Sequence, residues 1–192
     1  ETTIWGFKSQ RIIILIIYMP MIKAFRMDGL GNKFVIVDRR KNLVNISREK
    51  IIHLGNLDSF HRDIGFDQII FIEKEVDKAF PITIFNSDGN EVSACGNGSR
   101  CIAYLLGKDL NMKEIRLKTN NRLLNAKIVG DLDVELAMGK PIFKWDKIPL
   151  SKNLDNSNIT LNIEDKTFNE GFCVNVGNPH IIFFVKDCFE HD

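Results

Sequence analysis

The stretch from Asn86 to Cys101 reads N-S-D-G-N-E-V-S-A-C-G-N-G-S-R-C and is the most informative part of the sequence. Its first five residues are typical of a tight turn. From Arg100 to Leu106 the residues are mostly apolar, and this run predicts a helix that ends at Gly107. Cys95 therefore stands just before the expected amino terminus of a helix.

The residues around Cys95 suit the binding of a carboxylate. The first amides of a helix are unpaired and lie at the positive end of its dipole, so they bind anions and lower the pKa of a thiol. Gly96 and Gly98 carry no side chain that would keep a ligand from these amides. A thiol beside such a cradle can transfer a proton at the carbon next to a carboxylate. The alternative, from the residues alone, is a buried and inert cysteine in a glycine-rich turn.

Short apolar runs on either side of this segment predict a mixed domain with many strands and few helices. We expect a helix at 47–54, with Ser47 as its N-cap, and strands at 34–37, 68–73, 80–85, 115–118, 122–129, 132–138, 174–176 and 181–185. The strands do not alternate regularly with helices, as they do in a doubly wound sheet. The glycines at 29 and 31 lack the third glycine of a dinucleotide-binding fingerprint.

The composition is that of an ordinary globular protein. The 192 residues include 26 Lys and Arg and 25 Asp and Glu, which gives a net charge of +1. A broad basic surface for nucleic acid is therefore not expected. Apolar residues at 44% and charged residues at 27% exclude intrinsic disorder and fibrous proteins. Four cysteines in a chain of this length do not indicate a disulfide scaffold.

Residues 1–20 differ from the rest of the chain. Ile12 to Met19 is a continuous apolar run, but a helix needs about 20 such residues to span a bilayer. No small-residue cleavage site of a signal peptide follows the run, and Pro20 ends it. We expect residues 1–20 to be an amino-terminal extension and Met21 to open the domain. A membrane tether is the less favoured alternative.

The sequence resembles the diaminopimelate epimerase family in four places. The pattern N-x-D-G-x-E-x-x-x-C-G-N-G-x-R-C at 86–101 is similar to the family's cysteine signature. F-R-M-D-G-L-G-N-K-F at 25–34, G-F-D-Q at 65–68 and G-N-P-H at 177–180 resemble three further motifs, in the same order. The resemblance extends from about Met21 to the end of the chain.

The resemblance implies an α/β (α+β) fold of two pseudo-symmetric domains, each a mixed β-sheet wrapped around a central helix. Residues 21–139 would form the first epimerase domain, with Cys95 at a helix amino terminus. Residues 140–192 would form the opening part of the second, which would be truncated here. Proline-racemase-like and phenazine-biosynthesis-like isomerases remain alternatives of similar fold. A third alternative is a non-catalytic fragment that binds a carboxylate ligand or a partner half.

The resemblance also implies a reaction and a set of site residues. Members of the family interconvert LL- and meso-diaminopimelate with two cysteines on opposite faces of the α-carbon, without pyridoxal phosphate or a metal. Cys95 would be one of these cysteines, and His180 would support the site. The expected substrate-binding residues are Asn32, Gln68, Asn86, Gly96, Asn97 and Asn178. From the residues alone, each asparagine could instead serve its local turn, and His180 could be an ordinary loop histidine.

The remaining cysteines lack the context of a second catalytic cysteine. Cys101, Cys173 and Cys188 have no C-G-x-G-like surroundings, and we interpret them as structural. We therefore expect this chain alone to be unable to epimerise, and to be poorly soluble or oligomeric. Lys33, Asp63 and Asn90 also depart from the residues usual in the family. We expect a small-molecule substrate, no cofactor, no nucleic-acid or membrane partner, a possible homodimer and a cytoplasmic location.

Overall fold

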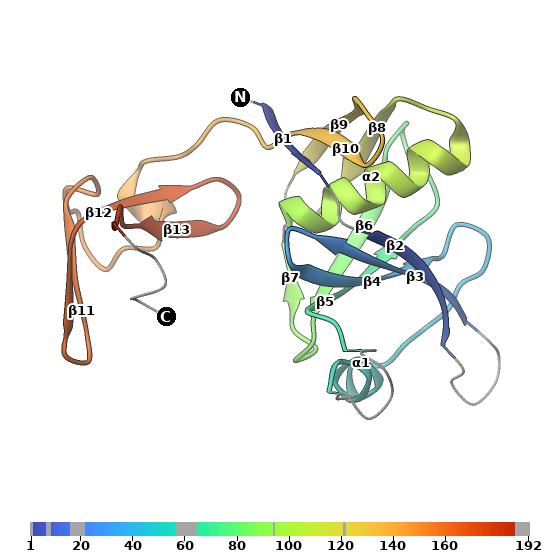
Figure 1. Cartoon of the computed structure of the whole chain (residues 1–192), viewed down its shortest axis with the longest axis horizontal. Helices are drawn as coiled ribbons and strands as arrows, with labels where there is room; N and C mark the ends of the chain where they lie inside the picture. The colour runs from blue at the N-terminus through green and yellow to red at the C-terminus, as the bar shows by residue number, and fades with distance from the viewer. Residues whose placement is uncertain are drawn as a thin grey trace. The chain divides into compact units, whose positions relative to one another are not determined.

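The computed structural model of the chain describes residues 2–6, 9–15, 22–56, 65–93, 95–120 and 122–186, the first two segments by their backbone alone. The chain divides into two compact units, Glu1–Met138 and Gly139–Asp192, which are described separately below (Figure 1). The sequence-based interpretations of Met21, Asp63 and Cys188 lie outside the described residues, as does the second half of the 12–19 run.

A mixed β-sheet dominates the first unit. Among the described residues it contains ten strands: β1 (Thr2–Gly6), β2 (Ser9–Leu15), β3 (Ile22–Gly29), β4 (Asn32–Asp38), β5 (Gln68–Ile72), β6 (Phe80–Asn86), β7 (Glu91–Val92), β8 (Glu114–Lys118), β9 (Leu123–Ile128) and β10 (Asp133–Ala137). Their order is β1-β10-β9-β8-β6-β5-β4-β3-β2, and β7 pairs with β6. The β4–β5 and β6–β8 pairs are parallel, and the other described pairs of this sheet are antiparallel.

The two ends of this sheet lie close together. β1 pairs with β10 and β2 pairs with β3, so the two strands occupy opposite ends of the strand order. Only two residues separate them in the sequence, and Cα atoms three residues apart are at most about 11 Å from each other. The sheet must therefore curl until its ends meet. Residues 2–6 and 9–15 belong to this sheet, which the sequence did not predict.

Helix α2 (Gly96–Leu110) lies inside the curl of the sheet (Figure 1). Each residue from Gly98 to Gly107 is buried, as expected for a central helix and not for a surface helix. The helix shares one core with the inner face of the sheet. Large buried side chains of the sheet in this core include Phe34, Ile36, Ile70, Ile72, Ile84 and Ile115.

Strands β4 and β5 are covered on both faces. Their outer face packs against helix α1 (Arg48–Gly55), which contributes the buried side chains of Ile51 and Leu54. Burial on both faces explains why the 34–37 and 69–72 segments are continuously apolar instead of alternating. The predicted N-cap of α1 is confirmed, because the Ser47 side chain accepts a hydrogen bond from the Lys50 amide.

The predicted end of helix α2 at Gly107 is wrong, since the helix continues to Leu110. Gly107 serves close packing instead of termination. A Cβ atom there would lie 2.7 Å from Cδ1 of Ile128 and 2.8 Å from the Met112 carbonyl oxygen. The helix ends at Asn111, which adopts the left-handed conformation with φ 54° and donates its backbone N–H to the Gly107 carbonyl.

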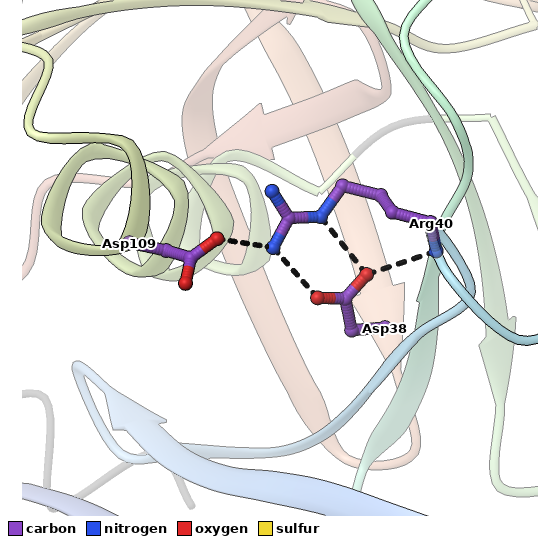
Figure 2. A network of polar contacts seen from close by, with 3 residues as sticks. All are labelled: Asp38, Arg40 and Asp109. Atoms are coloured by element: carbon purple, nitrogen blue, oxygen red, sulfur yellow. Dashed lines mark hydrogen bonds and ion pairs between the residues drawn. The ribbon is translucent and has the colours of Figure 1, made fainter.

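A network of charged side chains links the end of α2 to the end of β4 (Figure 2). The Arg40 guanidinium donates to both carboxylate oxygens of Asp38, at 2.9 and 2.7 Å, and to Asp109 at 2.7 Å. The Arg40 backbone amide also donates to Asp38 across 3.0 Å. One arginine therefore holds the last turn of the central helix against the sheet.

The second unit contains a smaller antiparallel sheet in its described residues. Its strands are β11 (Ile159–Ile163), β12 (Lys166–Asn175) and β13 (Pro179–Ile182), in the order β11-β12-β13. A short 3-10 helix, η2 (Trp145–Lys147), precedes them. β13 begins at Pro179, so His180 lies on a strand and not in a loop. No helix in the described parts of either unit is long and apolar enough to cross a membrane.

Candidate active site

Four segments of the first unit meet at one end of its sheet. Asn32 begins β4 and Gln68 begins β5, and these two strands are parallel. Asn86 ends β6, which runs antiparallel to β5, so it lies at the same end. The amino terminus of α2 reaches this end as well, because Asn97 contacts Asn32 there. The structure thus brings together five of the expected substrate-binding residues and Cys95.

Cys95 is the N-cap of helix α2. Its backbone is extended, with φ −146° and ψ 108°, and its Sγ accepts a hydrogen bond from the Gly98 amide at 3.4 Å. Its carbonyl oxygen accepts from the Ser99 amide at 2.9 Å. The thiol therefore occupies the place that a serine or aspartate side chain usually takes at a helix N-cap.

The pKa of the Cys95 thiol is raised above its ordinary value of 9.0. Burial is the largest cause, and it outweighs the amides of Gly98 and Asn97 and the charge of Arg100, which lower the pKa. The expectation of a lowered pKa from the helix amino terminus is therefore wrong for this chain, because that argument left out desolvation.

The glycines around Cys95 have different roles. A Cβ atom at Gly98 would lie 2.5 Å from Cδ1 of Ile70 and 3.5 Å from the sulfur of Cys95. Gly98 therefore allows the first turn of α2 to approach β5. At Gly96 a Cβ atom would lie 3.4 Å from the end of the Met138 side chain and 4.0 Å from Nη1 of Arg100, which are ordinary contacts. Gly96 fits an open approach to the backbone better than Gly98 does.

Asn32 is held by a tight turn and by helix α2. The turn between β3 and β4 has positive φ at Leu30 (54°) and Gly31 (87°), as in a type I′ hairpin. The Asp28 side chain accepts a hydrogen bond from the Gly31 amide at 3.1 Å and closes this turn. Beyond it, Asn32 Oδ1 accepts from Nδ2 of Asn97 at 2.7 Å. Two residues 65 positions apart in the sequence are thus joined at the site.

Gln68 and Asn86 are direct neighbours on adjacent strands. They form a register pair of β5 and β6, and Gln68 donates from Nε2 to Asn86 Oδ1 at 2.9 Å. The Oε1 atom of Gln68 is buried and has no hydrogen-bond partner among the described residues. A buried acceptor of this kind suits a ligand that carries N–H groups, such as an amino acid.

Asn178 and His180 belong to the second unit. The Nε2 atom of His180 lies 3.0 Å from Oδ1 of Asn178, and both residues are exposed. Their assignment to the same site as Cys95 stays a prediction. In the described residues no group of three or more His, Cys, Asp or Glu side chains could hold a metal ion.

Sequence reasoning missed Arg100, which lies at the site although it was given no role. Only 5% of this residue is exposed, and its guanidinium donates from Nη2 to Asn97 Oδ1 at 2.5 Å. A signal was present, because Arg100 stands directly before a buried apolar run, and an arginine that is buried is almost always paired. Cys101 is fully buried in the core with a pKa raised by burial, which confirms that it is a small buried residue of the helix.

The fold defines a class of protein. A phenazine biosynthesis protein of the PhzF family from Bacillus anthracis is similar with a TM-score of 0.51 and 17% identity, over 98% of this chain and 57% of that one. A predicted epimerase from Pseudomonas aeruginosa also gives 0.51, with 16% identity over 95% of this chain and 58% of that one. The chain therefore has the mixed α+β fold of PhzF-type proteins and related epimerases, which confirms the predicted fold class.

Sequence comparison narrows the class to one family. The family model described as diaminopimelate epimerase matches residues 24–144. The diaminopimelate epimerase of Pelagibacter ubique is 47% identical over 169 residues, and that of Acidiphilium cryptum is 37% identical over 162 residues. These matches cover 86% and 84% of this chain, and 60% and 57% of the two relatives. The chain belongs to the diaminopimelate epimerase family, as predicted, and spans about 60% of the length of such relatives.

Proposed function

We propose that this chain provides one side of the active site of a diaminopimelate epimerase. The enzyme would interconvert LL- and meso-diaminopimelate by proton transfer between two cysteines, and Cys95 would be one of them. The observation that carries the proposal is a cysteine at the amino terminus of a buried helix, beside Asn32 and Gly96, in a chain of this family. Residues 21–139 would form the first epimerase domain, and residues 140–192 the opening of the second.

The α-carboxylate of the substrate would lie at the amino terminus of α2. Backbone amides of Gly96 and Asn97 are at the positive end of this helix, and Gly96 leaves the backbone accessible. The same amides would stabilise the negative charge that develops when the α-proton leaves. Gln68, through its unpartnered Oε1, would accept a hydrogen bond from an ammonium group of the substrate.

Cys95 would transfer the proton on one face of the α-carbon. Its raised pKa favours the thiol form, from which it can donate a proton. A second cysteine on the opposite face would be its partner. Cys101 does not fit this role, because it is 0% exposed and packs in the core under the site. The proposal therefore needs a cysteine other than Cys95 and Cys101. Asn178 would bind the substrate, and His180 would support the site.

The wider setting follows from the same proposal. The substrate would be a small molecule used in lysine and peptidoglycan precursor synthesis, and the reaction would need no cofactor. We propose a cytoplasmic location and the possibility of a homodimer. A carboxylate-binding protein without epimerase activity is the second candidate, because a helix amino terminus near Asn32 can bind a carboxylate without any proton transfer.

Exchange of the substrate's α-proton with solvent tests the proposal. The full-length protein that carries this sequence is mixed with LL-diaminopimelate in D₂O, and loss of the α-proton signal is followed by proton NMR. We expect catalysed exchange with formation of the meso isomer. Binding without exchange would instead support the carboxylate-binding candidate, and the absence of both would refute the proposal.

A further inference from the structure

We propose that Arg100 is a positioning residue that fixes the orientation of the Asn97 and Asn32 side chains, so that Asn32 presents its NH₂ group to a carboxylate. We call Arg100, Asn97 and Asn32 the amide relay. The inference rests on the proposed function in one respect, since the carboxylate is taken to be that of the substrate.

The relay begins at a group that can only donate. Arg100 is the fifth residue of α2, is 5% exposed, and donates from Nη2 to Asn97 Oδ1 at 2.5 Å. A guanidinium has N–H donors and no acceptor. The carbonyl oxygen of the Asn97 side chain must therefore face Arg100, and its NH₂ group must face the other way.

The second step carries this orientation to the end of the sheet. The NH₂ group of Asn97 donates to Asn32 Oδ1 at 2.7 Å. Asn32 then has its oxygen in use, so its own NH₂ group is turned away from Asn97. Asn32 is exposed at the start of β4, where a ligand at the helix amino terminus can reach it. Arg100, which can only donate, therefore determines which atom of each asparagine side chain donates and which accepts.

This direction matters for the kind of ligand that the site accepts. A carboxylate only accepts hydrogen bonds. If the side-chain amides of Asn97 and Asn32 were both reversed, Asn32 would present its oxygen to the carboxylate. The result would be repulsion in place of a charge-assisted hydrogen bond. The arrangement therefore favours a group that accepts hydrogen bonds at this position, such as a carboxylate.

Stability alone does not explain a buried arginine here. The Nε atom of Arg100 is buried and has no hydrogen-bond partner among the described residues. Burial lowers the pKa of its guanidinium, as expected for a charge held away from water. An incompletely bonded buried cation is destabilising, so a role at the site accounts for it better than a role in packing.

The substitution Asn97→Asp tests the relay because it reverses its second step. Aspartate has nearly the shape of asparagine and still accepts from Arg100, but it cannot donate to Asn32. Asn32 must then turn its NH₂ group toward position 97 and present its oxygen to the ligand. Asn42→Asp, on an exposed loop, makes the same change in charge without touching the relay and is the matched control.

Two readouts separate the relay from the proposed function. The first, without ligand, is the solvent exchange of side-chain amide protons by NMR. We expect the Asn97 amide to be protected in the wild type, and the Asn32 amide to become protected in Asn97→Asp. The second is the affinity for diaminopimelate, which should fall about tenfold or more in Asn97→Asp and less than twofold in Asn42→Asp.

Substitutions of Arg100 complete the test. Arg100→Lys keeps a donor-only cation and should retain protection of the Asn97 amide, whereas Arg100→Met should lose it. Unchanged protection of the Asn32 amide in Asn97→Asp would overturn the relay, even if affinity fell, because the added charge alone could weaken binding. If the wild type shows the expected protection but does not bind diaminopimelate, the proposed function fails and the relay stands.

Discussion

The sulfur of Cys95 lies 3.4 Å from the backbone nitrogen of Gly98 and accepts its hydrogen bond. This contact places the thiol over the first turn of helix α2, where it is both buried and close to the positive end of the helix. Burial outweighs the helix, and the pKa of the thiol rises above its ordinary value of 9.0. Because the Gly98 amide holds the sulfur, the close packing of Gly98 against Ile70 also helps to fix the position of the thiol.

We predict that Cys95 reacts with iodoacetamide more slowly at neutral pH than an ordinary free thiol does, because its thiolate fraction is lower. The rate should keep increasing with pH beyond pH 9, since the pKa of Cys95 is raised. The rate from pH 7 to 10, measured by mass spectrometry of the labelled peptide, checks this. A rate that levels off below pH 8 would show that the helix amides lower the pKa of Cys95 by more than burial raises it. Cys101 should stay unlabelled in the folded protein.

Gly98→Ala should lower the free energy of unfolding by about 1–3 kcal/mol, because the added methyl group overpacks the contact with Ile70. Its Cβ atom would come within 2.5 Å of the Ile70 side chain. Gly96→Ala is the matched control, since its Cβ atom meets no such obstacle and alanine favours a helix. Urea unfolding of both variants makes the comparison. Equal stability of the two would contradict the assigned role of Gly98.

The stability of the first unit should decrease with acid through the Asp38–Arg40 pair. Burial by itself raises the pKa of Asp38, but its hydrogen bonds to Arg40 and the charges of Arg40 and Lys41 outweigh burial and hold it below the ordinary 3.8. A lowered folded-state pKa stabilises above the unfolded-state value, and this contribution is lost as the pH falls below about 4.

Substitution of Arg40 isolates this contribution. Arg40→Met should lower the free energy of unfolding by about 1 kcal/mol at pH 7 and by less at pH 3. Asp109→Asn should have a smaller effect, because the Asp109 side chain is 56% exposed. The same loss for Arg40→Met at both pH values would show that the charge network does not account for the pH dependence.

Deletion of residues 1–15 should destabilise the first unit and promote self-association. The deletion removes β1 and β2, and leaves β10 and β3 as unpaired edges of the sheet. Unpaired edges are templates for pairing between chains. Thermal unfolding and light-scattering chromatography of the intact chain and of the chain without residues 1–15 test this. A monomer of unchanged stability would mean that these strands contribute nothing to the closure of the sheet.

Except for the two-residue strand β7, the strands of the first unit from 34 to 138 were predictable from the sequence, because buried strands leave continuous or alternating apolar runs. The end of helix α2 was not, since Gly107 resembles a terminator and only its contact with Ile128 shows that it serves packing. The pairing of 2–6 and 9–15 with distant strands depends on tertiary contacts that no local pattern records.

The site was predictable only in part for similar reasons. Motifs indicated Cys95 and its neighbours, but the sign of its pKa shift depends on the balance between burial and the helix amides. The role of Arg100 depends on a contact with Asn97 that becomes visible only when the orientation of each amide is known. Sequence patterns identify residue types at a site more readily than they identify the direction of its hydrogen bonds.

The central claim is that Cys95 transfers a proton at the α-carbon of diaminopimelate. Its most direct test is the rate at which the full-length protein and its Cys95→Ala and Cys101→Ala variants convert LL-diaminopimelate to the meso isomer. The account predicts that Cys95→Ala reduces epimerisation at least 100-fold, within the range typical of a lost acid–base group. Cys101→Ala should retain most of the activity of the folded protein. Unchanged epimerisation by Cys95→Ala would contradict the account.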